Sequence, residues 1–132
     1  MPERSVIQAG RWRVVLVDSI TQLEPGDAGS IAVSGSHGGT SAAAYAAEVP
    51  LVLAVFNDAG VGKDEAGVIG LARLEAQGRA AATVSHLSAR IGEAADAWEN
   101  GVLSRVNAGA ARLGLRVGQR LKEALTGLRT PT

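Results

Sequence analysis

The chain has 132 residues, 46% of them hydrophobic and only 3% aromatic, and its 13 basic residues balance 13 acidic residues. This balance excludes the clustered excess of Lys and Arg that nucleic-acid binding requires, so no nucleic acid is expected as a partner. The chain has no cysteine, which excludes thiol nucleophiles, disulfides and thiolate metal sites.

A chain of this length predicts a single α/β domain over residues 1–132. The first residues lack the basic-then-apolar pattern of a signal peptide, and no apolar run approaches the roughly 20 residues that span a bilayer. We therefore expect a cytoplasmic protein that binds no membrane. Because the core must be built from small side chains, we also expect some burial to come from association of copies in a homo-oligomer.

The predicted elements alternate between strand and helix. Residues 1–10 are expected to form a loose lead-in and residues 129–132 a flexible tail. A first strand is predicted at 12–17, where Val14-Val-Leu-Val17 is the unbroken apolar run of a strand buried on both faces. Further strands are predicted at 29–34, 51–56 and 80–84, and helices at 40–48, 64–77, 93–113 and 117–128. The alternation predicts a small three-layer α/β/α domain with a mostly parallel sheet of about four to five strands.

The glycine-rich segment Ser34-Gly35-Ser36-His37-Gly38-Gly39 joins the second predicted strand to the first predicted helix, with Thr40 or Ser41 as its N-cap. In parallel sheets such a junction holds ligands, because the amides of the first helical turn point outward there. Glycine allows the sharp turn and the close approach of a ligand to the backbone.

Every predicted strand ends in polar side chains. In chain order these are Asp18 and Ser19; Ser34, Ser36 and His37; Asn57 and Asp58; and Ser85, His86, Ser88 and Arg90. If the strands are parallel, these groups meet at one edge of the sheet, and both histidines of the chain are among them. The pattern predicts a small-molecule site at that edge. Its predicted ligand-binding residues are Ser34, Gly35, Gly38, Gly39, Asn57, Ser85, Arg90 and Asp18.

The favoured chemistry is hydrolysis of a small amide or ester. The segment around Ser36 fits the relaxed nucleophile elbow, small-x-Ser-x-small, and Asp58 and His86 follow in the Ser, Asp, His order of the α/β-hydrolases. His86 would accept the Ser36 proton, Asp58 would orient His86, and amides around His37 and Gly38 would stabilise the oxyanion. The resemblance is confined to this elbow.

Two other chemistries fit the same residues. In the first, His37 or His86 is a general acid or base acting on an anionic metabolite, which Arg90 or Lys63 helps to bind. In the second, the two imidazoles, Asp58 and Asp18 hold a divalent metal. No close His-x-x-x-His spacing supports the metal, so the preferred interpretation contains neither a metal nor another cofactor.

A non-catalytic binding module is the alternative outside enzymes. Polar residues commonly follow strands only because turns need them, and Asp18, Ser19 and Asp64 are each explained as caps. The stripe of Leu115, Leu121, Leu125 and Leu128 packs either on the sheet or, in the interpretation that we favour, on another copy of the chain. The sequence does not decide between an enzyme and a binding module.

Overall fold

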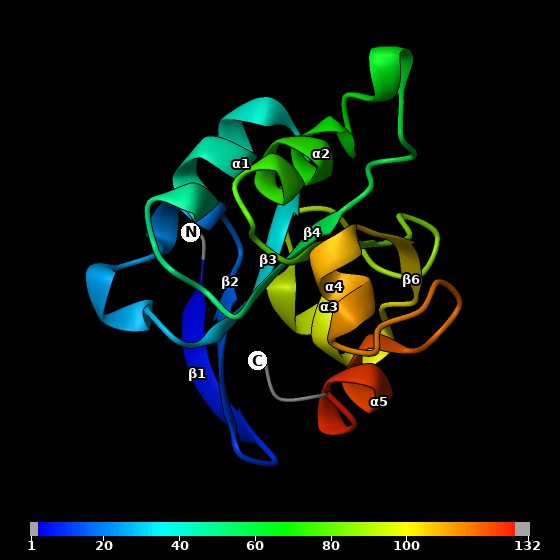
Figure 1. Cartoon of the computed structure of the whole chain (residues 1–132). Helices are drawn as coiled ribbons and strands as arrows, with labels where there is room; N and C mark the ends of the chain where they lie inside the picture. The colour runs from blue at the N-terminus through cyan, green and yellow to red at the C-terminus, as the bar shows by residue number, and fades with distance from the viewer. Residues whose placement is uncertain (1–2, 129–132) are drawn as a thin grey trace.

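Six strands form one sheet within residues 3–128, the part of the chain that the computed structural model describes. They are β1 (Arg4–Ala9), β2 (Trp12–Val17), β3 (Ile31–His37), β4 (Leu53–Asn57), β5 (Ala81–Val84) and β6 (Leu103–Val106), and they lie side by side in that order. Strands β2 to β5 run parallel, whereas β1 and β6 are antiparallel edge strands (Figure 1). The fold is therefore α/β with a sheet that is parallel at its centre.

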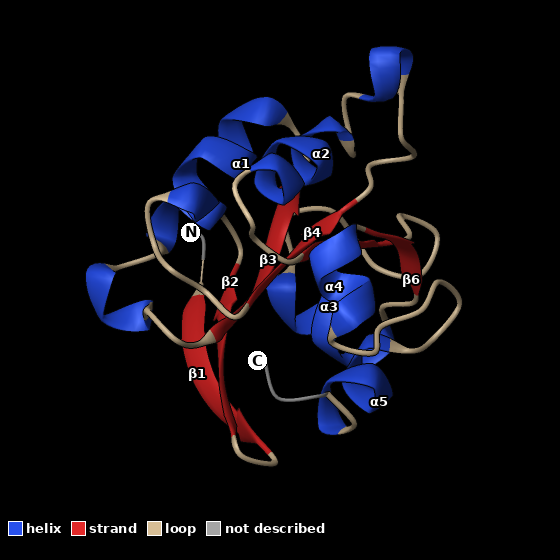
Figure 2. Cartoon of the chain, in the orientation of Figure 1, coloured by secondary structure: helices blue, strands red, loops and turns tan. Residues whose placement is uncertain are grey.

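The helices lie on both faces of this sheet (Figure 2). They are α1 (Thr40–Ala47), α2 (Ile69–Ala76), α3 (Ala94–Asn100), α4 (Ala108–Arg112) and α5 (Leu121–Thr126), with short 3₁₀ turns at Ile20–Gln22, Pro25–Asp27 and Lys63–Glu65. One core cluster joins the sheet to α1 and α2, and another joins it to α3, α4 and α5. In β4, Val55 belongs to one cluster and its neighbour Phe56 to the other. An unbroken apolar strand is thus buried on both faces.

The two antiparallel edge strands depart from the sequence-based expectation. Residues 4–9 form β1 rather than a loose lead-in, and they pair with β2 across a tight turn at Gly10. The helix expected at 93–113 is divided into α3, β6 and α4, because the backbone becomes extended at Gly101 (φ −60°, ψ 137°), the C-cap of α3. The sheet consequently has more strands than expected. The tail at 129–132 lies outside the described residues.

The leucine stripe near the C-terminus is part of the core. Leu115, Leu121, Leu125 and Leu128 are buried against the sheet face that α3 also covers, and Trp98 of α3 lies in the same cluster. Packing within the chain explains the stripe, so the expected contact between copies through these leucines is wrong. Within residues 3–128, no helix is long and apolar enough to cross a membrane.

A buried carboxylate connects β1 and β2 to the loop before β3. Asp27 is fully buried and accepts two hydrogen bonds from Arg4, at 2.7 and 2.8 Å, and one from Arg13 at 3.1 Å. The hydrogen bonds from Arg4 lower the pKa of Asp27, and burial raises it. Together with the hydrogen bonds from the Glu24 N–H and Arg13, those from Arg4 outweigh burial, so the pKa of Asp27 is about 2. Arg13 also donates to the Ser30 hydroxyl. The cluster fixes the edge of the sheet.

Candidate functional site

The carboxyl ends of β2 to β5 share one edge of the sheet. The strand register pairs Val17 with Ser34, His37 with Asn57, and Asn57 with Val84. The polar residues that follow these strands therefore come together from four separate parts of the chain.

Asp58 and His86 form the main polar contact at this edge. The Asp58 carboxylate accepts the backbone N–H of His86 at 3.0 Å and lies 3.2 Å from its ring nitrogen Nδ1. Asp58 is buried, whereas the His86 side chain is 46% exposed. A buried carboxylate thus holds an imidazole that solvent reaches.

Asp58 stays ionised in this position. Burial raises the pKa of its carboxyl group, but hydrogen bonds from the Gly60 N–H, the Ser104 hydroxyl and His86 together outweigh burial and lower the pKa below its usual value. The Gly60 N–H lies 2.8 Å from the carboxylate oxygen that also binds His86. The site therefore contains a fixed negative charge directly behind the imidazole.

The segment after Asp58 folds back on it. The Val61 N–H donates to the Asp58 carbonyl at 2.7 Å. Gly60 lies beside the His86 ring, since a Cβ atom added at Gly60 would be 3.5 Å from Cε1 of His86. Ala59, Val61, Asp64 and Glu65 all have φ between 51° and 68°, a conformation that residues other than glycine rarely adopt. The 3₁₀ turn Lys63–Glu65 in this segment projects from the body of the molecule (Figure 1).

The two serines of the expected nucleophile elbow have structural partners. The Ser36 hydroxyl accepts the N–H of Ile20 at 2.9 Å, and the buried Ser34 hydroxyl donates to the Val55 carbonyl at 2.9 Å. Among the described residues, neither hydroxyl lies within hydrogen-bond distance of an imidazole. The hypothesised triad is therefore present only as its Asp58–His86 half.

The glycines after Ser36 are tightly packed. The Gly38 N–H donates to the carbonyls of Gly67 and Asn57, at 2.9 and 3.2 Å, so it already has acceptors and does not serve an oxyanion. The exposed His37 imidazole lies against Gly39, where an added Cβ would be 2.8 Å from Nε2. Gly39, rather than Thr40 or Ser41, is the N-cap of α1.

Asn57 and Ser85 hold the turns around the pair in place. The buried Asn57 amide donates to Ala89 O at 2.9 Å and accepts the N–H of Ala59 at 2.8 Å. The Ser85 hydroxyl accepts the N–H of Leu87 at 3.1 Å. These bonds, all within the chain, position the loops that carry Asp58 and His86.

Asp18 and Gly35 connect the neighbouring strands to the start of α3. The Asp18 carboxylate accepts the N–H of Ala94 at 2.9 Å and that of Glu3 at 2.8 Å. Gly35 packs so closely that an added Cβ would lie 2.5 Å from the Gly92 carbonyl carbon. Asp18 thus caps the start of α3, which agrees with the capping role that the sequence analysis gave as the alternative to ligand binding.

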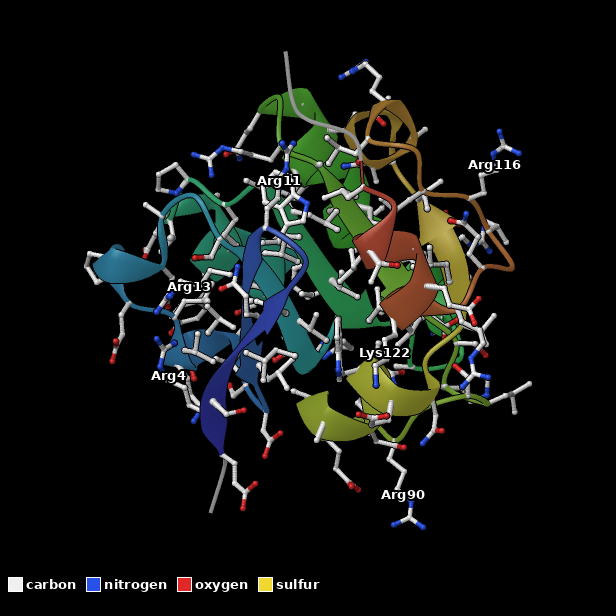
Figure 3. All side chains as sticks on the ribbon, turned by 90° about the horizontal axis from the view of Figure 1, so that it is seen from below. Arg4, Arg11, Arg13, Arg90, Arg116 and Lys122 are labelled. Carbon is white, nitrogen blue, oxygen red and sulfur yellow. The ribbon has the colours of Figure 1, made fainter. Side chains whose placement is uncertain are left out.

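The two candidate cations, Arg90 and Lys63, both have exposed side chains. The Arg90 side chain is 81% exposed, lies 3.9 Å from Glu93, and points away from the body of the molecule (Figure 3). Lys63 is exposed on the projecting turn. Within residues 3–128, no three His, Asp or Glu side chains are grouped so that they could hold a metal ion.

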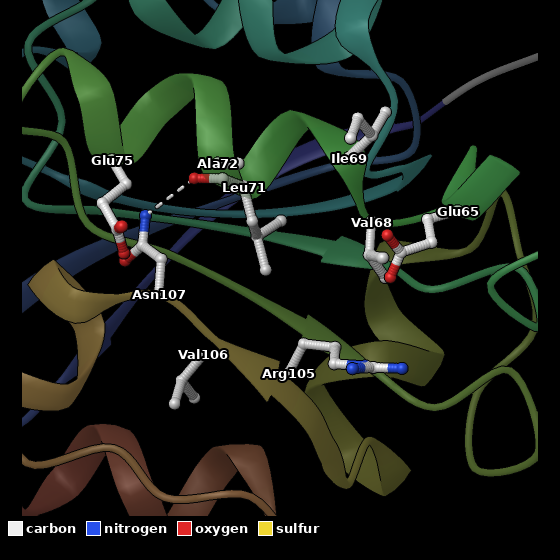
Figure 4. A pocket seen from close by; sticks show the side chains of 9 residues that line it. All are labelled: Glu65, Val68, Ile69, Leu71, Ala72, Glu75, Arg105, Val106 and Asn107. Carbon is white, nitrogen blue, oxygen red and sulfur yellow. Dashed lines mark hydrogen bonds between the residues drawn. The ribbon is translucent and has the colours of Figure 1, made fainter.

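A pocket of about 240 Å³ lies next to this edge, between α2 and β6. Val68, Leu71 and Val106 provide apolar walls, and Glu65, Glu75 and Arg105 provide charged groups (Figure 4). The pocket could not be predicted from the sequence, because residues 103–106 were expected to be helical, whereas in β6 Arg105 lies opposite Thr83 of β5.

No protein-family model, curated protein or solved structure matches the chain.

Proposed function

We propose that the chain is an enzyme that transfers a proton to or from a small molecule, with His86 as the general acid–base and Asp58 as its positioning residue. The observation that carries the proposal is the contact between the buried Asp58 carboxylate and Nδ1 of a half-exposed imidazole. Acid–base catalysis requires such a group, which must be reachable by substrate and held in one orientation.

The direction of proton transfer follows from the donors and acceptors. An ionised carboxylate only accepts hydrogen bonds, so Nδ1 of the neutral ring carries the proton and Nε2 is the basic nitrogen. Within the described residues Nε2 has no hydrogen-bond partner. Nε2 is therefore the atom that takes a proton from the substrate, and Asp58 stabilises the imidazolium that forms.

Serine hydrolysis is less favoured, because the Ser36 hydroxyl is bonded to the Ile20 N–H and not to His86. The substrate class that remains is a small molecule with a removable proton, such as a carbon acid next to a carbonyl group. Such a reaction needs one base and one positioned substrate, and no covalent intermediate.

Exchange of substrate protons with solvent tests the proposal. The chain is incubated in D₂O with a panel of small keto acids, hydroxy acids and amino acids, and deuterium uptake is followed by NMR. We expect His86→Gln to lower the exchange rate roughly a hundredfold or more and Asp58→Asn to lower it by a smaller factor. The control His37→Gln retains the wild-type rate.

Either of two results contradicts the proposal. One is wild-type exchange in His86→Gln, since the base must then be another group. The other is a folded chain that exchanges no compound of the panel. Circular dichroism of each variant establishes that the fold is retained.

A further inference from the structure

The pocket between α2 and β6 combines apolar walls with charged groups of both signs. Val68 and Leu71, from the start of α2, and Val106 of β6 form its apolar part. Arg105 and Glu65 lie toward the same end of the pocket, and Glu75 lies at the other end (Figure 4). Its volume of about 240 Å³ is slightly below the ~300–1,000 Å³ of most ligand pockets, so the occupant is a small metabolite.

Arg105 and Glu65 are available to a ligand. Neither side chain forms an ion pair or a side-chain hydrogen bond within residues 3–128, and both residues are exposed. Two opposite charges therefore share one end of the pocket without pairing with each other. Glu75, in contrast, is already engaged, because its carboxylate accepts the N–H of Ala108.

We propose that this pocket binds an α-amino acid with an apolar side chain. The Arg105 guanidinium binds the carboxylate of the ligand, which it matches in charge and planar geometry. The Glu65 carboxylate binds the ammonium group. The apolar side chain lies on Val68, Leu71 and Val106, where it is removed from water.

The assignment to a zwitterion uses the two charged groups of the pocket that have no partner among the described residues, Arg105 and Glu65. A simple carboxylate would bring its charge close to Glu65, and a simple amine would bring its charge close to Arg105. Only a ligand with both charges, such as an α-amino acid, satisfies the two side chains together. This site does not include His86 or Asp58, so its occupancy is independent of the proposed proton transfer.

NMR titration of the ¹⁵N-labelled full chain tests the proposal with L-leucine as the probe. We expect saturable shifts of the backbone amides of α2 and β6. Arg105→Gln should weaken L-leucine binding roughly tenfold or more, because a charge-assisted hydrogen bond is lost. Two control variants should retain the wild-type affinity for L-leucine. They are Arg116→Gln, at an exposed arginine outside the pocket, and His86→Gln.

Two analogues test the roles of the charged groups separately. 4-Methylpentanoate lacks the ammonium group and 3-methylbutylamine lacks the carboxylate, and both should bind at least about tenfold more weakly than L-leucine. Glu65→Gln should weaken L-leucine binding but not that of 4-methylpentanoate. The proposal is overturned if L-leucine fails to shift α2 and β6, if Arg105→Gln binds it normally, or if either analogue binds as tightly as L-leucine.

Discussion

The carboxylate oxygen Oδ1 of Asp58 binds His86 twice, through the backbone N–H at 3.0 Å and through Nδ1 at 3.2 Å. Because both bonds use the same oxygen, the carboxylate fixes the imidazole relative to the turn that carries it. Asp58 and His86 are 28 residues apart in the chain, and the parallel pairing of β4 with β5 brings them together. This pairing leaves Nε2 as the ring nitrogen available for chemistry.

This contact fixes the tautomer of His86. In its neutral form we expect the proton on Nδ1, because the Asp58 carboxylate only accepts hydrogen bonds. Imidazole ¹⁵N–¹H correlation spectra should show a protonated Nδ1 and an unprotonated Nε2. In Asp58→Asn the preference should weaken, since an amide both donates and accepts. A neutral ring protonated on Nε2 in the wild-type chain would contradict the assigned orientation.

Ser36 gives a second test, which separates structural from nucleophilic roles. Its hydroxyl accepts the N–H of Ile20, so Ser36→Ala should lower the free energy of unfolding by about 1 kcal/mol. Ser41→Ala, at an exposed serine of α1 that makes no capping hydrogen bond, should change it by less than about 0.5 kcal/mol. Urea unfolding measures both.

A fluorophosphonate probe examines the nucleophilic role directly. We expect no adduct on the wild-type chain, because no imidazole accepts a hydrogen bond from Ser36 in the described residues. A single adduct that is lost in Ser36→Ala would restore the serine hydrolase hypothesis.

Much of the sheet could be predicted because its central strands are buried on both faces. The apolar runs Val14–Val17 and Leu51–Phe56 have no polar face, which is characteristic of a strand between two layers of side chains. Parallel pairing of β3, β4 and β5 then follows from the helices between them, whereas β2 and β3 are joined only by two 3₁₀ turns. The same reasoning brings Asp58 close to His86, although their catalytic role remains a prediction.

The edge strands could not be predicted in this way. In β1 only Ala9 is buried, so its pattern resembles an irregular segment. The four residues of β6 follow alanine-rich α3, and their strand conformation depends on pairing with β5, which is a tertiary contact. Because a helix was predicted where β6 lies, the α2–β6 pocket could not be predicted either. The partner of Ser36 was hidden for a similar reason, since Ile20 lies in a connecting loop.

Asp27 should make stability depend on pH in the acidic range. Its pKa of about 2 in the folded chain lies below the value of about 4 in an unfolded chain. A lowered carboxyl pKa stabilises the fold above about pH 4, and this contribution of roughly 2 kcal/mol is lost as pH falls toward 2. Asp27→Asn should therefore be less stable than wild type at neutral pH by about 2 kcal/mol or more.

The pH profile distinguishes this ionic contribution from loss of packing. The difference in unfolding free energy between wild type and Asp27→Asn should shrink between about pH 4 and pH 2. Glu48→Gln, which changes an exposed carboxylate at the end of α1, should track wild type throughout. A difference for Asp27→Asn that is constant with pH would refute the ionic role.

Gly35 allows β3 and the start of α3 to approach each other closely. An added Cβ would lie 2.5 to 2.7 Å from backbone atoms of Gly92, Glu93 and Asp18, none of which moves easily. Gly35→Ala should lower the free energy of unfolding by at least about 2 kcal/mol. Gly26→Ala, where nothing lies within 4 Å, should be neutral or slightly stabilising. Equal stabilities in urea unfolding would contradict this packing.

Ala59 is held in a left-handed conformation directly after Asp58, with φ of 51°. A side chain in this region costs about 1–2 kcal/mol, part of which glycine offsets through its greater freedom in the unfolded chain. Ala59→Gly should therefore raise the free energy of unfolding by about 0.5–1 kcal/mol. Ala44→Gly, in the exposed face of α1, should lower it by about the same amount. Thermal and urea unfolding measure both, and a loss of stability in Ala59→Gly would show that the turn after Asp58 has ordinary backbone geometry.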